Sequence, residues 1–554
     1  MQQGGESGHT AIMSEQASER PIGRGLSRGP LAAAAALPLG VFTLLAWRFW
    51  FVCDDAFIAF RYARNLTEHA GLRFNPGEHT PVEGYTELPW VLLCALFETL
   101  GAELALWAPL VSCLCGAVLL WRVMARVSGY GAGVTCATGL LLATLPPLFV
   151  WSSGGLATVP FALTLFIAWE RLLADGTPRT GRAAAVAGLW LVAVILMRAD
   201  GVGWALTLLG LAALQRGGAG ESQAARLRAL LPTGSLVLCG LAAVTLWRLS
   251  YYGDWLPNTA RAKLGLGAPA FERGARYLAS MALAMPAIPL ALGLSVGRGV
   301  LREPRPRAAL AIVAATSAHV VLTGGDFMCY GRFLVPALPF LALLWARRLA
   351  AGHHALAKGL ARGLTWGLTA GLLLLSLATA FDVLRAPRSW AEAVHFRWNY
   401  PQPRTELEQW RRMDAQAREW RDLGLSLARH TEPGDSLTYG AMGAVGYYSR
   451  LFLFDHNGLV TREVARRAPL GGRRSPGHDK TVPKEFFLKD APTFMEAFLW
   501  PRGVPLPAHI QARRAAWIEV PLTGDDPRPD HSLFLEPGPG FRRADAGAAA
   551  AGGR

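Results

Sequence analysis

Two adjacent aspartates are the residues best placed to do chemistry. Asp54 and Asp55 directly follow an apolar stretch at residues 31–52, so they fall at a lipid–water boundary, where carboxylates are costly unless the protein uses them. If the chain continues as a helix, the two side chains point about 100° apart, and one of them faces a site. A solvated pair at a helix end is the alternative. Arg61 and Asn65 weaken it, because helical spacing sets both on the face of Asp54.

Two other polar segments carry cations beside apolar runs. Residues 251–263 read YYGDWLPNTARAK, and Lys263 could neutralise a phosphate borne by a lipid. A lysine that only extends its charged end to the interface fits this position equally well. Residues 324–332 read GGDFMCYGR. The glycines permit tight turns and Arg332 could bind phosphate oxygens with two N–H groups, although a plain loop anchor is the alternative.

The composition places these segments in a membrane protein. Of the 554 residues, 52% are hydrophobic and only 17% are charged, which is too apolar for an ordinary soluble enzyme. The net charge of +15 lies largely in arginines of short loops between apolar runs. No basic stripe alternates with aromatic residues as strand binding requires, so we expect no nucleic-acid partner. The seven cysteines show neither a disulfide framework nor zinc-ligand spacing.

Apolar runs recur through the first two thirds of the chain, and we expect about eleven membrane-spanning helices from them. The runs are residues 31–52, 103–120, 131–151, 158–173, 183–197, 201–214, 229–249, 279–296, 308–322, 333–345 and 364–381. A further apolar stretch, residues 87–101, is short, and we expect it to lie along the outer interface rather than to cross.

The distribution of arginine predicts the orientation, because Lys and Arg are retained on the cytoplasmic side. With the N-terminus inside, the inner loops collect most of the charge: Arg122, Arg126, Arg171, Arg179, Arg182, Arg216, Arg226, Arg228, Arg298, Arg302, Arg305, Arg307, Arg347, Arg348, Lys358 and Arg362. The same assignment puts residues 53–86, 251–276, 324–332 and everything after Asp382 together outside.

The sequence thus predicts an α-helical polytopic membrane protein with a C-terminal extracytoplasmic α/β domain. The expected parts are a flexible cytoplasmic N-terminus, a transmembrane domain whose first outer loop is catalytic, a soluble domain and a disordered tail, at residues 1–30, 31–384 (loop 53–102), 385–543 and 544–554. Within the soluble domain, the patterns predict a helix at residues 406–430 and strands at 436–439 and 451–454.

These motifs resemble those of GT-C glycosyltransferases related to the terminal β-(1→2)-arabinofuranosyltransferase of mycobacterial cell walls. The resemblance is carried, in matching order, by DDAFIAFRYARNL at residues 54–66, GLRFNPGE at 71–78, VEGYT at 82–86, and the blocks at 251–263, 324–336, 441–446 and 455–459. It covers most of the chain. Two departures, Glu87-Leu88 before the Pro-Trp pair and Met328-Cys329-Tyr330 in place of a proline-bearing tract, bear on the sugar pocket.

The resemblance implies a GT-C fold and transfer of a sugar from a polyprenyl-phosphate donor to a cell-envelope glycan or glycolipid, at the inner membrane of a bacterial-type cell. It implies that Asp54 is the general base and that Asp55 supports or binds the acceptor. The implied phosphate ligands are Lys263, Arg332 and Arg61, and the implied substrate-binding residues are Glu83, Tyr85, Tyr252, Asn258 and Asp326. No cofactor or metal is indicated.

Two other functions fit parts of the same sequence. A flippase or transporter of lipid-linked sugars would also have many helices, but it would normally bury charge near the membrane midplane or repeat broken helices. A non-catalytic envelope protein could bind glycan through its C-terminal domain alone, although one helix would suffice to anchor it. The large soluble domain on many helices favours an enzyme that handles glycans.

Overall fold

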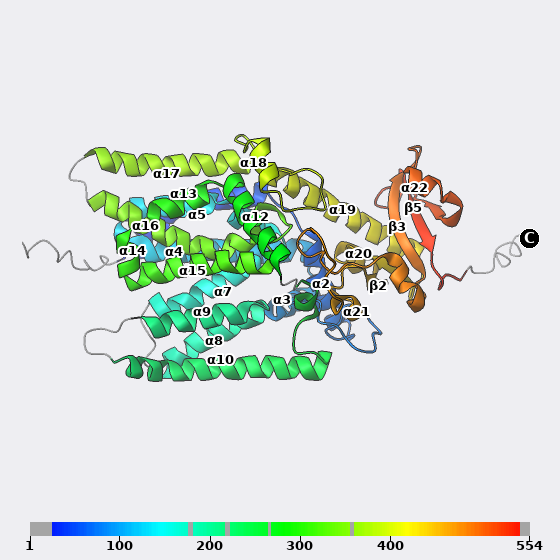
Figure 1. The fold of residues 1–554 in the computed structure, drawn as a ribbon, viewed down its shortest axis with the longest axis horizontal. Coiled ribbons are helices and arrows are strands. Elements are labelled where there is room, and N and C mark those ends of the chain that lie inside the picture. The colour runs from blue at the N-terminus through cyan, green and yellow to red at the C-terminus, as the bar shows by residue number, and fades with distance from the viewer. Residues whose placement is uncertain (1–24, 175–180, 216–221, 264–266, 355–358, 543–554) are drawn as a thin grey trace, which may run out of the picture.

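The computed structural model describes residues 25–174, 181–215, 222–263, 267–354 and 359–542. A bundle of long helices occupies one end of the molecule and a small sheet domain the other, with α2 (Asp54–Thr67) and the polar loops between them (Figure 1). The tail predicted at residues 544–554, and all but the last few residues of the predicted N-terminal segment, lie outside the described part.

Six described helical segments are long and apolar enough to cross a membrane. They are α1 (Arg28–Arg48), α4 (Leu104–Val127) with η1 (Ser128–Tyr130), α10 (Gln223–Tyr252), α15 (Pro304–Thr323), η3 (Cys329–Ala337) with α16 (Leu338–His354), and α17 (Gly359–Ala380). Two bent pairs raise the number to eight if each makes one span: α5 (Ala132–Thr144) with α6 (Pro146–Ser153), and α12 (Ala268–Ala284) with α13 (Ala287–Ser295).

The predicted count of eleven spans is therefore not confirmed. Prolines interrupt two of the expected spans, since Pro146 follows a 60° bend and Pro286 lies at a 93° bend, and proline removes a helical hydrogen bond. α3 (Leu88–Thr99), α8 (Gly181–Met197) and α9 (Gly201–Leu214) are apolar but short. α7 (Thr158–Trp169), continued by the π-helical turn η2 (Glu170–Ala174), is buried along most of its length.

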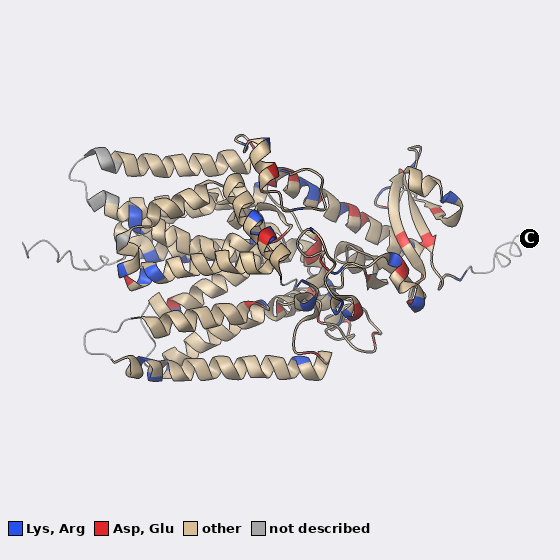
Figure 2. Ribbon diagram, viewed as in Figure 1, with Lys and Arg blue, Asp and Glu red and all other residues tan. Residues whose placement is uncertain are grey.

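The chain is a multi-pass membrane protein, and its charges are strongly sorted. Lys and Arg gather at the end of the bundle that lies away from the sheet domain, whereas the middle of the helices is almost free of charge (Figure 2). At that end Arg122 and Arg126 both pair with Glu170, and Arg347 pairs with Glu303. This sorting follows the pattern expected of cytoplasmic loops.

The soluble domain is built on a mixed sheet of five strands. These are β1 (Ser436–Tyr439), β2 (Phe452–Asp455), β3 (Phe494–Pro501), β4 (Ile518–Pro521) and β5 (His531–Pro537), in the order β2-β1-β3-β5-β4. β1 pairs in parallel with β2 and β3, and Leu437 stands opposite Leu453 on one side and Phe494 on the other. β5 runs antiparallel to β3 and β4.

The helix and strands predicted in this domain are confirmed. α19 covers Glu406–His430 and begins with a capping box, in which Thr405 and Glu408 satisfy each other's backbone N–H groups. β1 matches its prediction and β2 is shifted by one residue. Short elements complete the described chain: α11 (Asn258–Lys263), α14 (Arg298–Arg302), α18 (Arg388–Ala393), α20 (Ala444–Ser449), α21 (Arg462–Ala465), η4 (Lys484–Asp490), α22 (Ala508–Gln511) and η5 (Arg514–Ala516).

The sorting of charge predicts the topology. An alkaline phosphatase fused after Asp382 should be active, because the distribution of arginine predicts that this point lies outside, and one fused within residues 171–182 should be inactive. Green fluorescent protein at the same two points should give the opposite pattern, as it folds in the cytoplasm. If both fusion points report the same side of the membrane, the orientation is wrong.

Candidate functional site

The carboxylate of Asp54 connects the membrane bundle to the soluble domain. Asp54 is the first residue of α2, and its side chain accepts hydrogen bonds from the backbone N–H groups of Gly443, at 3.2 Å, and Ala444, at 2.7 Å. Gly443 approaches so closely that a Cβ atom built on it would lie 1.8 Å from the Asp54 carbonyl oxygen. Only glycine fits at position 443.

This setting tunes the acidity of Asp54. Desolvation in the enclosed junction, with a smaller contribution from the negative charge of Asp55, raises the pKa of the Asp54 carboxyl to about 7 against the opposing effect of the N–H donors of Ala444 and Gly443. A carboxyl group that titrates near neutrality can accept a proton as effectively as it later gives one up. Asp54 therefore has the acidity expected of a general base.

Asp55 faces different neighbours. Its charge acts on Arg332 and on His478, and on the thiol of Cys53, the residue that precedes α2. Among the described residues, no hydrogen bond or ion pair occupies the Asp55 carboxylate. The helix predicted to continue from Asp54 is confirmed as α2, in which the Asp54 carboxylate bonds to the soluble domain and the charge of Asp55 acts on Arg332.

Arg61 is buried between α2, the loop after it and the soluble domain. Its guanidinium donates to the carbonyl oxygens of Phe74 (2.7 Å), Gly446 (2.8 Å) and Leu451 (2.7 Å), and to Oδ1 of Asn75 (3.1 Å). Only 3% of the residue is exposed. The sequence predicts a phosphate ligand at this position, but these four acceptors make Arg61 a structural clamp, and we do not retain it as a phosphate ligand.

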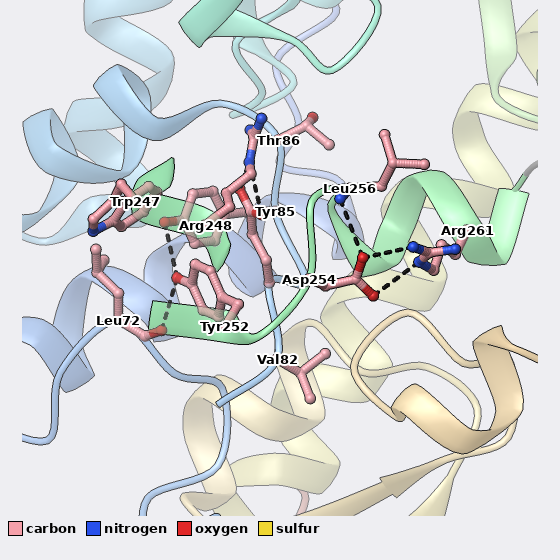
Figure 3. Close-up of polar contacts among 12 residues, drawn as sticks. Leu72, Val82, Tyr85, Thr86, Trp247, Arg248, Tyr252, Asp254, Leu256 and Arg261 are labelled. Carbon is pink, nitrogen blue, oxygen red and sulfur yellow. Dashed lines mark hydrogen bonds and ion pairs between the residues drawn. The ribbon is translucent and has the colours of Figure 1, made fainter. Parts of the chain in front are cut away.

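The residues predicted to bind substrate in the first two outer loops contact one another. Both carboxylate oxygens of Glu83 accept from Nε of Arg248, at 2.9 and 3.0 Å. The hydroxyl groups of Tyr85 and Tyr252 lie 3.1 Å apart, and that of Tyr252 donates to the Leu72 carbonyl oxygen (Figure 3). These contacts fix the first loop against the end of α10.

Asn258 joins the second loop to the soluble domain. Its side-chain amide donates to the carbonyl oxygens of Gly458 and Leu459, at 2.8 and 2.9 Å. Its backbone N–H donates to the backbone carbonyl oxygen of Glu83. The carboxylate of Asp455 stabilises the turn that contains Gly458 and Leu459, because it accepts a hydrogen bond from the backbone N–H of Val460. The sequence blocks at residues 82–86, 251–263 and 455–459 therefore meet in space.

Lys263 occupies the exposed end of α11. The nearby Asp254 is paired with Arg261, at 2.6 Å (Figure 3), and with Arg466, whereas Lys263 makes no ion pair or hydrogen bond within the described part of the chain. Its charge reaches His478, on which the charge of Asp55 also acts. The predicted role of Lys263 as a phosphate ligand thus stays open to test.

Arg332 lies at a sharp turn before α16. Tyr330 and Gly331 both have left-handed backbone conformations, with φ of 48° and 59°, and this turn directs Arg332 back to Asp326, whose carboxylate it contacts at 2.8 Å. The side chain of Glu406 fixes the turn by accepting the N–H of Tyr330. The first residue of α19 therefore positions the third predicted motif.

A narrow cavity lies beside Arg332, and most of its polar residues escaped the sequence predictions. It is lined by Thr158, Phe161, Arg198, Asp200, Trp204, His319, Arg332, Phe333 and Pro336. The available signal was the triplet Arg198-Ala199-Asp200, which places two charges between the apolar runs at 183–197 and 201–214. Charges in such a place are functional candidates.

Comparisons with known proteins agree on the kind of protein this is. Terminal β-(1→2)-arabinofuranosyltransferases from Corynebacterium glutamicum and Mycobacterium tuberculosis are 28% and 26% identical over 358 and 339 residues. These matches cover 56% and 54% of this chain and 49% and 53% of the relatives, so the chain spans about half the length of the curated relatives it matches. A model described as a domain of unknown function (DUF8728) matches residues 407–526.

Solved structures extend the likeness over nearly the whole chain. ArnT from Cupriavidus metallidurans bound to undecaprenyl phosphate superposes with a TM-score of 0.52 at 14% identity, covering 92% of this chain and 98% of ArnT. ArnT from the same organism in the apo state superposes with a TM-score of 0.51 at 12% identity, covering 91% of this chain and 98% of ArnT. The chain has the GT-C fold. The resemblance drawn from the sequence motifs is confirmed at this level.

The polar loops and the soluble domain meet at the end of the bundle where α2 lies (Figure 1), and α2 begins with Asp54 and Asp55. The structure brings together Asp54, Asp55, Asp326 and Arg332 around the start of α2, and it places Glu83, Tyr85, Tyr252 and Asn258 in the neighbouring loop junction. Within the described residues, no group of three or more His, Cys, Asp or Glu side chains could hold a metal ion.

The contact between Gly443 and Asp54 predicts a specific steric effect. Gly443→Ala should push α20 away from α2, lower the free energy of unfolding by about 1–3 kcal/mol and expose the connection near residue 385 to protease. Gly440→Ala is the matched control on the same loop, because the nearest atom to its Cβ would be 3.6 Å away. Thermal unfolding measures the loss of stability, and limited proteolysis measures the exposure of the connection. Equal stability and equal protease sensitivity of the two variants would contradict the tight junction.

Proposed function

We propose that this protein is a membrane glycosyltransferase that moves a sugar from a polyprenyl-phosphate donor to a cell-envelope glycan or glycolipid. The observation that carries the proposal is the position of the Asp54 carboxylate, which accepts the backbone N–H groups of Gly443 and Ala444 at the junction of the membrane bundle and the soluble domain; burial there raises its pKa to about 7. The named arabinofuranosyltransferases make arabinofuranose the first sugar to test. The undecaprenyl phosphate bound to ArnT supports a lipid phosphate as the carrier.

In the proposed reaction, the acceptor hydroxyl oxygen attacks the anomeric carbon of the donor. The bond from that carbon to the phosphate oxygen breaks, the lipid phosphate leaves with the electron pair, and Asp54 takes the hydroxyl proton. General-base catalysis of this kind typically contributes about 10² to 10⁴-fold. Asp55 supports or binds the acceptor. Cations stabilise the negative charge that develops on the departing phosphate.

The two faces of α2 suit this division of labour. Asp54 is directed toward the soluble domain, from which a large glycan acceptor can approach, and Asp55 is directed toward Arg332 and the ends of the membrane helices. A lipid-linked donor has its phosphate at that depth. We further propose that the soluble domain is extracytoplasmic, that the N-terminus is cytoplasmic, and that the membrane is the inner membrane of a bacterial-type cell.

The raised pKa of Asp54 predicts the pH dependence of transfer. The base must be ionised, so kcat/KM should rise with pH through about 7 and then level off. Asp54→Asn should abolish this rise of kcat/KM with pH and lower the rate by at least about 10²-fold, since an amide cannot accept the proton. Asp55→Asn should change mainly KM. Limited proteolysis shows whether the domain of Asp54→Asn stays docked. A wild-type profile that is flat between pH 5 and 8 would remove Asp54 as the base.

The donor is tested by following both products of the cleavage. Purified protein in nanodiscs should release free polyprenyl phosphate from a labelled polyprenyl-phosphate sugar only when an acceptor is present, whereas a flippase would move the lipid without cleaving it. Arg332→Ala and Lys263→Ala should each raise KM and lower kcat, because the phosphate gains charge as the bond breaks. Arg332→Lys should recover part of the loss. Wild-type release by both alanine variants would place the phosphate elsewhere.

A further inference from the structure

One loop of the soluble domain, between α21 and η4, returns to the helix bundle. Its residues 475–478 read Ser-Pro-Gly-His and form a tight turn, in which the backbone N–H of His478 donates to the carbonyl oxygen of Ser475 at 3.2 Å. Gly477 has φ of 80°, as the third position of a type II turn requires, and proline suits the second position. The turn is therefore encoded locally, and His478 is its last residue.

Two charged residues directly after the turn anchor the loop to the bundle. The carboxylate of Asp479 pairs with the guanidinium of Arg273 on α12, at 2.8 and 3.0 Å, and Nε of this guanidinium donates to the carbonyl oxygen of Gly324. Nζ of Lys480 donates to the carbonyl oxygen of Arg261, on α11, at 2.8 Å. The loop is therefore fixed both to α11 and to the segment that follows α15.

The anchored loop packs His478 against Phe327. The centroids of the two rings lie 5.6 Å apart, and their planes are inclined at 56°. Phe327 follows Asp326, the partner of Arg332. The side chain of His478 is half-buried, yet its ring nitrogens make no hydrogen bond or ion pair in the part of the chain that the structure describes. A polar ring that packing holds in place without a polar partner calls for an explanation.

His478 is a neighbour of two other unpaired groups of the proposed site. The charges of Asp55 and Lys263 both act on its ring, and neither of these side chains forms a hydrogen bond or ion pair within the described ranges. The three residues come from α2, from α11 and from the loop of the soluble domain. Three polar groups from separate segments are thus brought together without bonding to one another, as expected of groups that bind a common ligand.

The surroundings of His478 keep its imidazole neutral. Burial is the largest effect and lowers the pKa of His478, the charge of Asp55 opposes this effect, and the charge of Lys263 adds to it. The ion pair of Asp479 with Arg273 acts in both directions, because the carboxylate raises the pKa and the guanidinium lowers it. A neutral imidazole has one donor and one acceptor nitrogen. It therefore matches a hydroxyl group, which also donates and accepts, better than a phosphate, which only accepts.

We propose that His478 forms a hydrogen bond with a hydroxyl group of the donor sugar and helps to select that sugar. The inference rests on the proposed function and deepens it, because it adds a residue of the soluble domain to the substrate site. In the proposed reaction the donor sugar lies between the acceptor, which Asp55 supports or binds, and the phosphate, for which Lys263 is a candidate ligand. His478 has both of these residues as neighbours, so its ring is placed beside the sugar itself.

Donor analogues that lack one hydroxyl group test this contact. The transferred sugar is supplied as its polyprenyl phosphate, beginning with arabinofuranose, together with analogues in which each hydroxyl group in turn is replaced by hydrogen. With the wild type, one of these deoxy donors should lose about 10-fold or more in kcat/KM, because the imidazole is left without its partner. With His478→Ala the intact donor should lose about as much, and the same deoxy donor should lose almost nothing more.

Three variants keep the test clear. His478→Phe retains a ring against Phe327 but carries no nitrogen, so it should unfold close to the wild-type temperature and still fail to discriminate the intact donor from the deoxy donor. His478→Asn should recover part of the discrimination, since an amide both donates and accepts. His430→Ala is the matched control, because His430 is a partly exposed histidine of the same domain whose polar neighbour, Asp526, lies between β4 and β5. It should discriminate as the wild type does.

The outcomes separate this contact from the proposed function. If the wild type transfers sugar and the His478 variants lose the same factor with every deoxy donor, the inference is overturned and the proposed function stands. If the non-additive loss appears only with deoxy acceptors, His478 binds the acceptor and its assignment to the donor is wrong. If the wild type transfers no sugar from any polyprenyl phosphate, the proposed function fails and the inference fails with it.

Discussion

The burial of the Arg61 guanidinium is the constraint on which the rest of the site depends. Its acceptors come from the first outer loop and from the α20–β2 region of the soluble domain. One side chain on α2 therefore joins α2 to both of these segments. A buried charge that loses its partners costs on the order of 3–5 kcal/mol. The soluble domain is therefore held firmly to the membrane bundle, and the N–H groups of Gly443 and Ala444 stay aligned with Asp54.

The geometry that follows divides α2 into two functional faces. A rotation of about 100° between successive helix positions separates Asp54, which contacts the soluble domain, from Asp55, whose charge acts on Arg332. In the proposed reaction the base and the leaving group must lie on different sides of the sugar, and a single helix start between two domains provides that arrangement. Glu83 with Arg248, and Asn258 with the turn after β2, keep the intervening loops from shifting.

The sequence predicted features whose causes are local. Two carboxylates after an apolar run identified the pair for which we propose catalytic roles, and the cap and periodicity of α19 gave its bounds. The role of Arg61 was beyond reach, because its acceptors Gly446 and Leu451 lie 385 and 390 positions away. His319 was missed because it is a single polar residue in an apolar run, and Arg198 was missed because the sequence does not show which distant segments surround it. The span count is not confirmed where prolines bend the helices and where α7 is buried.

The environment of Asp54 shows why the soluble domain is needed in the proposed reaction. Free in water, an aspartate has a pKa near 3.8, and its carboxylate is a weak base toward an acceptor hydroxyl at neutral pH. Enclosure at the junction with α20 raises the pKa to about 7, and enclosure exists only while the domain is docked. In the proposed reaction, docking therefore sets the strength of the base, and the soluble domain acts through its backbone N–H groups and its exclusion of water, without supplying a reacting side chain of its own.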